Sequence, residues 1–201
     1  MEDKRDKILQ VAVREFAEHG YKAASTNQIC DAAGVSKGLI FHYFGSKEKL
    51  YTAAVAYSMD LAMREVSMEE MPKGDFVQGA IWSTKQKLSF SRKYPAVFQL
   101  IMQSYANPPA VLAERLRAYY AELMQVQEVY VNQVFEKVTL REDVSYEDAR
   151  DVVQGLFDYT IKMATDYMQR HPNATMEDMQ PLADKFKNMM AIVERGMVDK
   201  A

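Results

Sequence analysis

The 201-residue sequence contains a single cysteine, Cys30, and has no long apolar run. One cysteine cannot form an internal disulfide, which fits a reducing compartment. A membrane-spanning helix needs roughly 20 consecutive apolar residues, and no such stretch occurs. Residues 1–7 alternate in charge and lack the apolar stretch of a signal peptide. We therefore expect a soluble, cytoplasmic protein without a membrane partner.

Residues typical of metal sites and active sites are also scarce. The three histidines, His19, His42 and His171, lie far apart, and none has a second ligand at metal-binding spacing. No Ser/His/Asp or Cys/His signature is present either. We expect no metal, no cofactor and no enzymatic activity, and we predict that Cys30 is a buried structural residue rather than a redox sensor. The net charge of −3 permits a local basic face without requiring one.

Apolar residues recur at helical spacing almost everywhere, and the alternation typical of strands is almost absent. The composition, 48% hydrophobic and 26% charged, suits a globular protein with a buried core. The sequence therefore predicts an all-α fold of about nine helices. Their expected ranges are about 8–20, 25–33, 37–44, 47–70, 76–92, 95–106, 112–134, 145–170 and 175–198.

Several glycine, serine and threonine residues are expected to mark where these helices begin or end. Gly20 is predicted to end the first helix in the left-handed conformation. A capping box of Ser25 and Gln28 is expected to begin the second helix, and Thr175 with Asp178 to begin the last. Gly155 falls inside a helix, where glycine costs roughly 1 kcal/mol relative to alanine. We expect close approach of another helix there, with a loose kink as the alternative.

Pro72 and Gly74 mark the clearest boundary along the chain. They predict a first helical domain over residues 1–50 and a second helical domain over 72–201, linked through the helix at 47–70.

The stretch from residue 25 to 49 has the form of two short helices joined by the tight turn 33–36, which contains a glycine. This is the helix-turn-helix pattern, whose second helix enters the major groove of DNA. The side chains expected to hold the two helices together are Ile29, Ala33, Val35 and Ile40. Those expected on exposed turns are Lys37, Gly38, Leu39, Phe41, His42 and Tyr43. An ordinary helical hairpin with inward-packed aromatic rings is the alternative.

The run ICDAAGVSKGLIFHYFGSKEKL, residues 29–50, resembles the DNA-binding signature of the TetR family of repressors. Residues 8–21 resemble the first helix of that family, with Phe16, Gly20 and Tyr21 in the expected places. The resemblance is strong over about residues 5–55. Beyond residue 72 it rests on the number and lengths of the helices.

The resemblance implies a DNA contact for eleven residues, which are Ser25, Thr26, Asn27, Ser36, Lys37, Gly38, Leu39, Phe41, His42, Tyr43 and Lys47. The first three open the first helix of the motif, where N–H and hydroxyl groups can meet a phosphate. Lys37 could donate to guanine and Leu39 could contact a thymine methyl group. Tyr43 and Lys47 are expected to clamp the backbone. Phe41 replaces a common tyrosine and so lacks its hydroxyl, and His42 either touches the backbone or packs.

The resemblance also implies an effector pocket and a dimer interface in the second half of the chain. Candidate pocket residues are the aromatic, methionine and aliphatic side chains Trp82, Phe98, Met102, Tyr105, Tyr120, Met124, Phe157 and Ile161. The last two helices, about 146–170 and 176–198, are expected to form a four-helix bundle with their symmetry mates.

The predicted function is a dimeric repressor that binds a palindromic operator in double-stranded DNA and is released by a small apolar or amphipathic effector. Two alternatives remain open. One is a DNA-binding dimer without an effector, regulated by abundance or by a protein partner. The other is an interaction protein whose helix-turn-helix is only structural.

Overall fold

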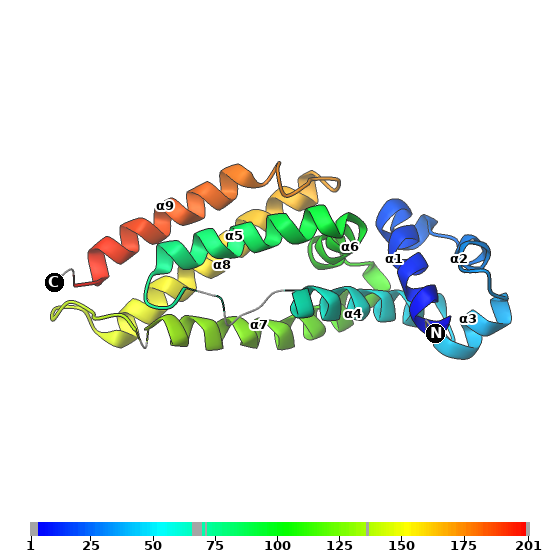
Figure 1. Cartoon of the computed structure of the whole chain (residues 1–201), viewed down its shortest axis with the longest axis horizontal. Coiled ribbons are helices and arrows are strands. Elements are labelled where there is room, and N and C mark those ends of the chain that lie inside the picture. The colour runs from blue at the N-terminus through cyan, green and yellow to red at the C-terminus, as the bar shows by residue number, and fades with distance from the viewer. Residues whose placement is uncertain (1–3, 66–69, 71, 136, 200–201) are drawn as a thin grey trace. The chain divides into compact units, whose positions relative to one another are not determined.

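A computed structural model describes residues 4–65, 70, 72–135 and 137–199, except for the side chains of 122–130 and 133 (Figure 1). Its described residues form nine α-helices, which confirms the predicted all-α fold. They are α1 (Lys4–Ala23), α2 (Thr26–Ala33), α3 (Lys37–Phe44), α4 (Lys47–Glu65), α5 (Phe76–Lys93), α6 (Pro95–Ala106), α7 (Ala113–Phe135), α8 (Tyr146–Arg170) and α9 (Gln180–Met197). The last residues predicted for the 47–70 helix include 66–69, which lie outside the described residues.

Contacts between residues divide the chain into two compact units. Unit 1 consists of Met1–Val66 and Phe90–Ala118, and unit 2 consists of Ser67–Ser89 and Tyr119–Ala201. The helix α6 therefore belongs to the same unit as α1–α4. The predicted domain boundary near residue 72 stays a prediction, because a boundary between sequence domains and a division by contacts are different properties.

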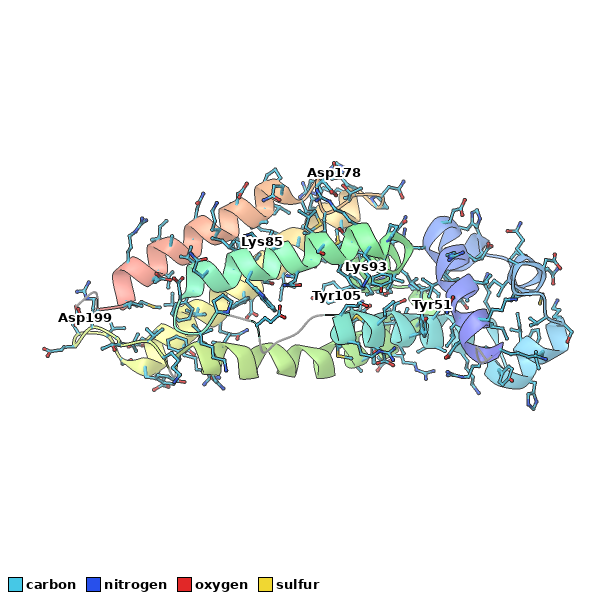
Figure 2. All side chains as sticks on the ribbon, in the orientation of Figure 1. Tyr51, Lys85, Lys93, Tyr105, Asp178 and Asp199 are labelled. Atoms are coloured by element: carbon cyan, nitrogen blue, oxygen red, sulfur yellow. The ribbon has the colours of Figure 1, made fainter. Side chains whose placement is uncertain are left out.

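The core of unit 1 forms around α1, which packs against α2, α4 and α6. Phe16 is fully buried and meets the ring of Tyr51 on α4 edge to face, with 4.9 Å between ring centroids. Tyr51 is labelled in Figure 2. The amide of Gln103 on α6 donates to the carbonyl of Ala17 at 3.3 Å. An aromatic contact therefore joins α4 to the first helix, and a hydrogen bond joins α6 to it.

Gly20 interrupts α1 with φ 69° and ψ 169°. The positive φ agrees with the prediction and favours glycine. The ψ value is extended, so the residue is not in the left-handed helical conformation that the sequence suggested. The chain makes a kink here, and helical hydrogen bonding continues to Ala23.

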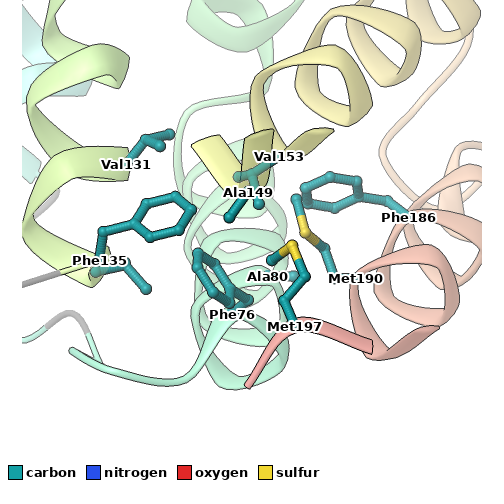
Figure 3. Packing of buried hydrophobic residues seen from close by; sticks show 10 residues of the cluster. Phe76, Ala80, Val131, Phe135, Ala149, Val153, Phe186, Met190 and Met197 are labelled. Carbon is teal, nitrogen blue, oxygen red and sulfur yellow. The ribbon is translucent and has the colours of Figure 1, made fainter. Parts of the chain in front are cut away.

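The core of unit 2 joins α5, α7, α8 and α9 (Figure 3). Phe76 on α5 meets Phe135 on α7 at 5.1 Å between ring centroids. Val153 of α8 and Met190 of α9 are fully buried in the same cluster. The helices α8 and α9 contact each other directly, as Figure 1 also shows. The last two helices are thus anchored on one side by a common apolar core.

The last helix begins later than predicted. Thr175 and Asp178 do hydrogen bond to each other, with the Thr175 N–H donating to the Asp178 carboxylate at 2.8 Å, but they close a turn. The helix begins at Gln180. Pro181 explains the difference, because proline lacks an N–H and fits only the first turn of a helix. A helix that began at Thr175 would have placed Pro181 in its interior.

Gly155 also departs from the prediction. A Cβ built on it would meet no atom of the described residues within 4 Å, so no other helix in this part of the chain comes close. The residue is exposed on α8 and lies within a continuous helix. Neither close approach within the chain nor a break in the helix accounts for this glycine.

Candidate nucleic-acid interface

The first helix of the motif, α2, is capped at both ends. At its start, the Ser25 hydroxyl accepts from the Gln28 N–H at 3.4 Å. The Ser25 N–H donates to the Glu15 carboxylate of α1 at 2.7 Å. One hydrogen bond of the predicted capping box, from the Gln28 N–H to the Ser25 hydroxyl, is therefore present. The other is wrong, because the Ser25 N–H donates to Glu15, ten residues upstream, and not to the Gln28 side chain. At its end, Gly34 is left-handed, with φ 66° and ψ 40°, as the turn requires.

The turn and the second helix, α3, follow the predicted pattern. Ser36 caps α3, and its hydroxyl accepts from the Leu39 N–H at 3.3 Å. Of the four side chains expected to hold the two helices together, Ile29, Ala33 and Ile40 are buried and Val35 is half-buried. The two helices contact each other, so the exposed side of α3 has a defined orientation.

Most of the α3 residues assigned to DNA contact are exposed. Lys37, Gly38 and His42 are exposed, and Leu39 is half-buried. Phe41 is 44% exposed and Tyr43 is 39% exposed. The alternative of an ordinary hairpin with inward-packed rings is therefore wrong for these two side chains, which are large apolar groups left at the surface.

The start of α2 offers a second group of polar atoms. Ser25 and Thr26 are half-buried and Asn27 is exposed. The first N–H groups of any helix lack partners within it, so this end can receive a phosphate oxygen. The phosphate contacts of Ser25, Thr26 and Asn27 stay predictions.

Lys47, which the resemblance assigns to the DNA backbone, is engaged within the chain. Its ammonium donates to the carbonyl of Ala24 at 2.6 Å and to that of Lys22 at 3.1 Å. It also lies 5.2 Å from the centroid of the Tyr21 ring. These contacts secure the corner between α1 and α2, a structural role that the sequence motif did not reveal. A phosphate contact by its remaining N–H stays a prediction.

Cys30 is a free, buried cysteine on α2, as predicted. Its carbonyl accepts from the Val35 N–H at 3.0 Å, which helps to close the turn after the helix.

The predicted effector residues are divided between the two units. Phe98, Met102 and Tyr105 lie on α6 in unit 1, and Trp82, Tyr120, Phe157 and Ile161 lie in unit 2. Phe98 and Tyr120 are buried, and the other five are half-buried. The side chain of Met124 lies outside the described residues. Phe157 packs on Phe186 of α9 at 5.2 Å between ring centroids, so it has a structural role in unit 2.

The described residues contain no group of three or more His, Cys, Asp or Glu side chains that could hold a metal ion. In the same part of the chain, none of the helices combines the length and the hydropathy that crossing a bilayer requires.

In this chain, a capped α2, a glycine turn and an α3 with an exposed basic and aromatic side define a helix-turn-helix. Comparisons with known proteins identify its family. Residues 8–54 match the profile described as "Bacterial regulatory proteins, tetR family". Residues 75–198 match "Tetracyclin repressor-like, C-terminal domain". The chain belongs to the TetR family, whose members are regulators rather than enzymes, in agreement with the sequence.

Curated relatives match mainly at the N-terminal end. The transcriptional repressor AcnR of Corynebacterium efficiens is 53% identical over 49 residues, which are 24% of this chain and 26% of AcnR. The transcriptional regulator RutR of Escherichia coli K12 is 32% identical over 114 residues, which are 55% of this chain and 52% of RutR. The chain thus spans about half of RutR and a quarter of AcnR.

Solved structures match over almost the whole chain. A TetR regulator from Chloroflexus aurantiacus is 19% identical with a TM-score of 0.63, covering 98% of this chain and 97% of its own. A TetR-like regulator from Rhodococcus sp. RHA1 is 14% identical with a TM-score of 0.65, covering 96% of each chain. At this level of identity, the likeness establishes the fold.

Proposed function

We propose that this regulator is a homodimeric repressor that binds a palindromic operator and leaves it when a small apolar or amphipathic effector binds. The observation that carries the proposal is a set of large apolar side chains exposed on the last two helices. Tyr146, Val152 and Tyr159 of α8 are each about half exposed, at 52%, 49% and 45%, and Ile192 of α9 is 63% exposed. Large apolar side chains that stay exposed favour a partner surface.

The spacing along α8 supports a second copy of the chain as that partner. Val152, Gly155 and Tyr159 follow the i, i+3, i+7 pattern, so they lie on one face of the helix. Gly155 is exposed on this face, and a Cβ added to it would lie more than 4 Å from any atom of another helix among the described residues. A glycine between two apolar side chains permits another helix to approach closely, and an isologous dimer supplies an identical face.

A dimer also meets a requirement of DNA recognition. A single helix-turn-helix makes few base contacts, whereas a two-fold dimer binds two half-sites about 34–36 Å apart or a multiple of that distance. In each half-site, Lys37 and Leu39 would contact base edges. Gly38 lies beside them at the start of α3. Phosphate contacts would come from the start of α2, from Tyr43 and from the remaining N–H of Lys47, with His42 close to the backbone.

The effector part of the proposal is supported by side chains of the right chemistry. Trp82, Met102, Tyr105 and Ile161 are half-buried, so each has both packed and accessible surface. Aromatic rings and methionines form adaptable apolar sites, and tyrosine hydroxyls add polar anchors. An effector acts only through a higher affinity for the released state. Shifting the population almost completely requires a preference of about 5.5 kcal/mol.

Two substitutions of one residue test the dimer. Gly155→Ala adds only a methyl group, whereas Gly155→Arg adds a long charged side chain to the proposed interface. We expect the wild type and Gly155→Ala to sediment at micromolar concentration with twice the chain mass of 23.1 kDa. We expect Gly155→Arg to sediment as a monomer and to bind weakly to a duplex that the wild type selects from a random pool. A monomeric wild type, or a dimeric Gly155→Arg that binds normally, would contradict the proposal.

A compound panel tests the effector. Hydrophobic and amphipathic compounds are added to the complex with the selected duplex, and both DNA release and Trp82 emission are recorded. We expect at least one compound to release the DNA and to change the emission. Trp82→Phe should abolish the emission change while preserving release. A broad panel without release would favour regulation by abundance or by a protein partner.

A further inference from the structure

The first turn of α1 is rich in positive charge. Lys4, Arg5 and Lys7 are three cations within four residues, and Asp6 is the one acid among them. All four side chains are exposed. The family signature that indicates DNA binding does not assign these residues a role, and the proposed function does not use them.

The structure places two of these cations beside the helix-turn-helix. The ammonium of Lys7 lies 3.9 Å from the position that a Cβ on Gly34 would occupy, so it sits at the turn between α2 and α3. The guanidinium of Arg5 lies 5.6 Å from the ring centroid of Phe44, the last residue of α3. Figure 1 accordingly draws the N-terminal end of α1 beside α3. One turn of α1 therefore lies beside the turn that precedes α3 and beside the last residue of α3.

Cations of the motif itself continue this arrangement. Lys37 is exposed at the start of α3. The ammonium of Lys49 lies 3.9 Å from the position of a Cβ on Gly45, just after α3 ends. Positive side chains from α1, α3 and α4 thus lie close to the turn before α3, to its start and to its end. A segment of this charge, continuous with a DNA-binding surface, is suited to the phosphates that flank the bases in the groove.

We propose that Lys7 and Arg5 bind DNA phosphates on either side of the bases read by α3, which extends the interface onto α1. The inference rests on the proposed docking of α3 in the major groove. Contacts of this kind position the protein on the duplex and carry no sequence information. They also make affinity depend on salt, because each neutralised phosphate releases counterions.

The test measures affinity against salt concentration on two duplexes, one selected by the wild type and one of random sequence and equal length. Each phosphate that a bound chain no longer neutralises should decrease the slope of log K against log salt by about 0.9. In the proposed dimer each substitution removes two such contacts, so we expect the slope to decrease by about 1.8 for Lys7→Gln and for Arg5→Gln, with the preference for the selected duplex unchanged. Lys85→Gln, on α5 in unit 2, makes the same charge change and should leave the slope unaltered.

Two further variants separate charge from folding. Lys7→Arg and Arg5→Lys keep the positive charge and should restore the wild-type slope. Thermal unfolding of each variant shows whether the contact of Arg5 with Phe44 matters for stability. Lys7→Gln and Arg5→Gln with wild-type slopes would overturn the inference. A wild type without salt-dependent binding would instead overturn the proposed docking itself, so the two failures are distinguishable.

Discussion

Replacing Lys47 by methionine separates a structural role of this residue from a role in DNA binding. The variant keeps most of the side-chain volume and removes the charge. It eliminates the hydrogen bonds to the carbonyls of Ala24, at 2.6 Å, and Lys22, at 3.1 Å. It also removes the cation near the ring of Tyr21. The two carbonyls belong to the corner between α1 and α2, so the substitution weakens the support of the helix-turn-helix.

The magnitude follows from the exposure of the two bonds. A hydrogen bond to a charged group contributes about 1.5–3 kcal/mol. The hydrogen bond to Ala24 is partly buried, so its contribution to stability falls within this range. The hydrogen bond to Lys22 is exposed to competing water, so its contribution is small. We expect Lys47→Met to lower the free energy of unfolding by about 2 kcal/mol. At about 2–4 °C per kcal/mol for a chain of this size, Tm should fall by about 4–8 °C.

The assay is thermal unfolding followed by circular dichroism without DNA. Lys49→Met is the matched control, because Lys49 is an exposed lysine on the same helix. We expect its Tm to stay near that of the wild type. Equal Tm values for the two variants would refute the structural role of Lys47. A salt titration with DNA then reports the other role, since removal of one phosphate interaction per chain is two per proposed dimer and decreases the slope by about 1.8.

Three further predictions concern base reading, pH dependence and the turn. Lys37→Ala should cost about 1–3 kcal/mol of binding and relax specificity at one base position, as measured by competition among single-base variants of the selected duplex. Hydrogen bonds from Lys93, at 2.6 Å, and Tyr94, at 2.7 Å, hold the pKa of Glu65 below its ordinary value of 4.5. Their stabilisation is therefore complete above pH 4.5 and is lost as pH falls through the lowered pKa, so the Tm gap between wild type and Glu65→Gln should shrink on acidification. Gly34→Ala should destabilise the protein by about 1–2 kcal/mol in urea unfolding, because φ is 66° there.

The parts of the fold that the sequence predicted well are those governed by local chemistry. Ser25, Gly34 and Ser36 cap helices at the expected places, since a serine hydroxyl and a left-handed glycine act within three or four residues. The error at the last helix has a local cause too. Thr175 and Asp178 make the hydrogen bonds of a helix start, but Pro181 excludes a helix that would run through it.

Partners that are distant in sequence could not be predicted from caps or periodicity. The Glu15 carboxylate on α1 accepts a hydrogen bond from the N–H of Ser25. The short capping motif around Ser25 does not indicate this partner. The same holds for Lys47, whose position in the signature suggested a phosphate while its ammonium meets two backbone carbonyls. A lysine side chain is long enough for either partner, so only the arrangement of α1 against α4 decides between them.

The position of α6 connects the fold to the proposed response. Pro72 and Gly74 are the strongest local break in the sequence, yet α6, which follows them, packs against α1 and α4 in unit 1. The hydrogen bond from Gln103 to the Ala17 carbonyl joins α6 to the helix that supports α2. Met102, an effector candidate, is the chain neighbour of Gln103. An effector that contacts α6 would therefore act on the compact unit that contains the recognition helix. Its preference for one arrangement of that unit would be expressed directly as a change in DNA affinity.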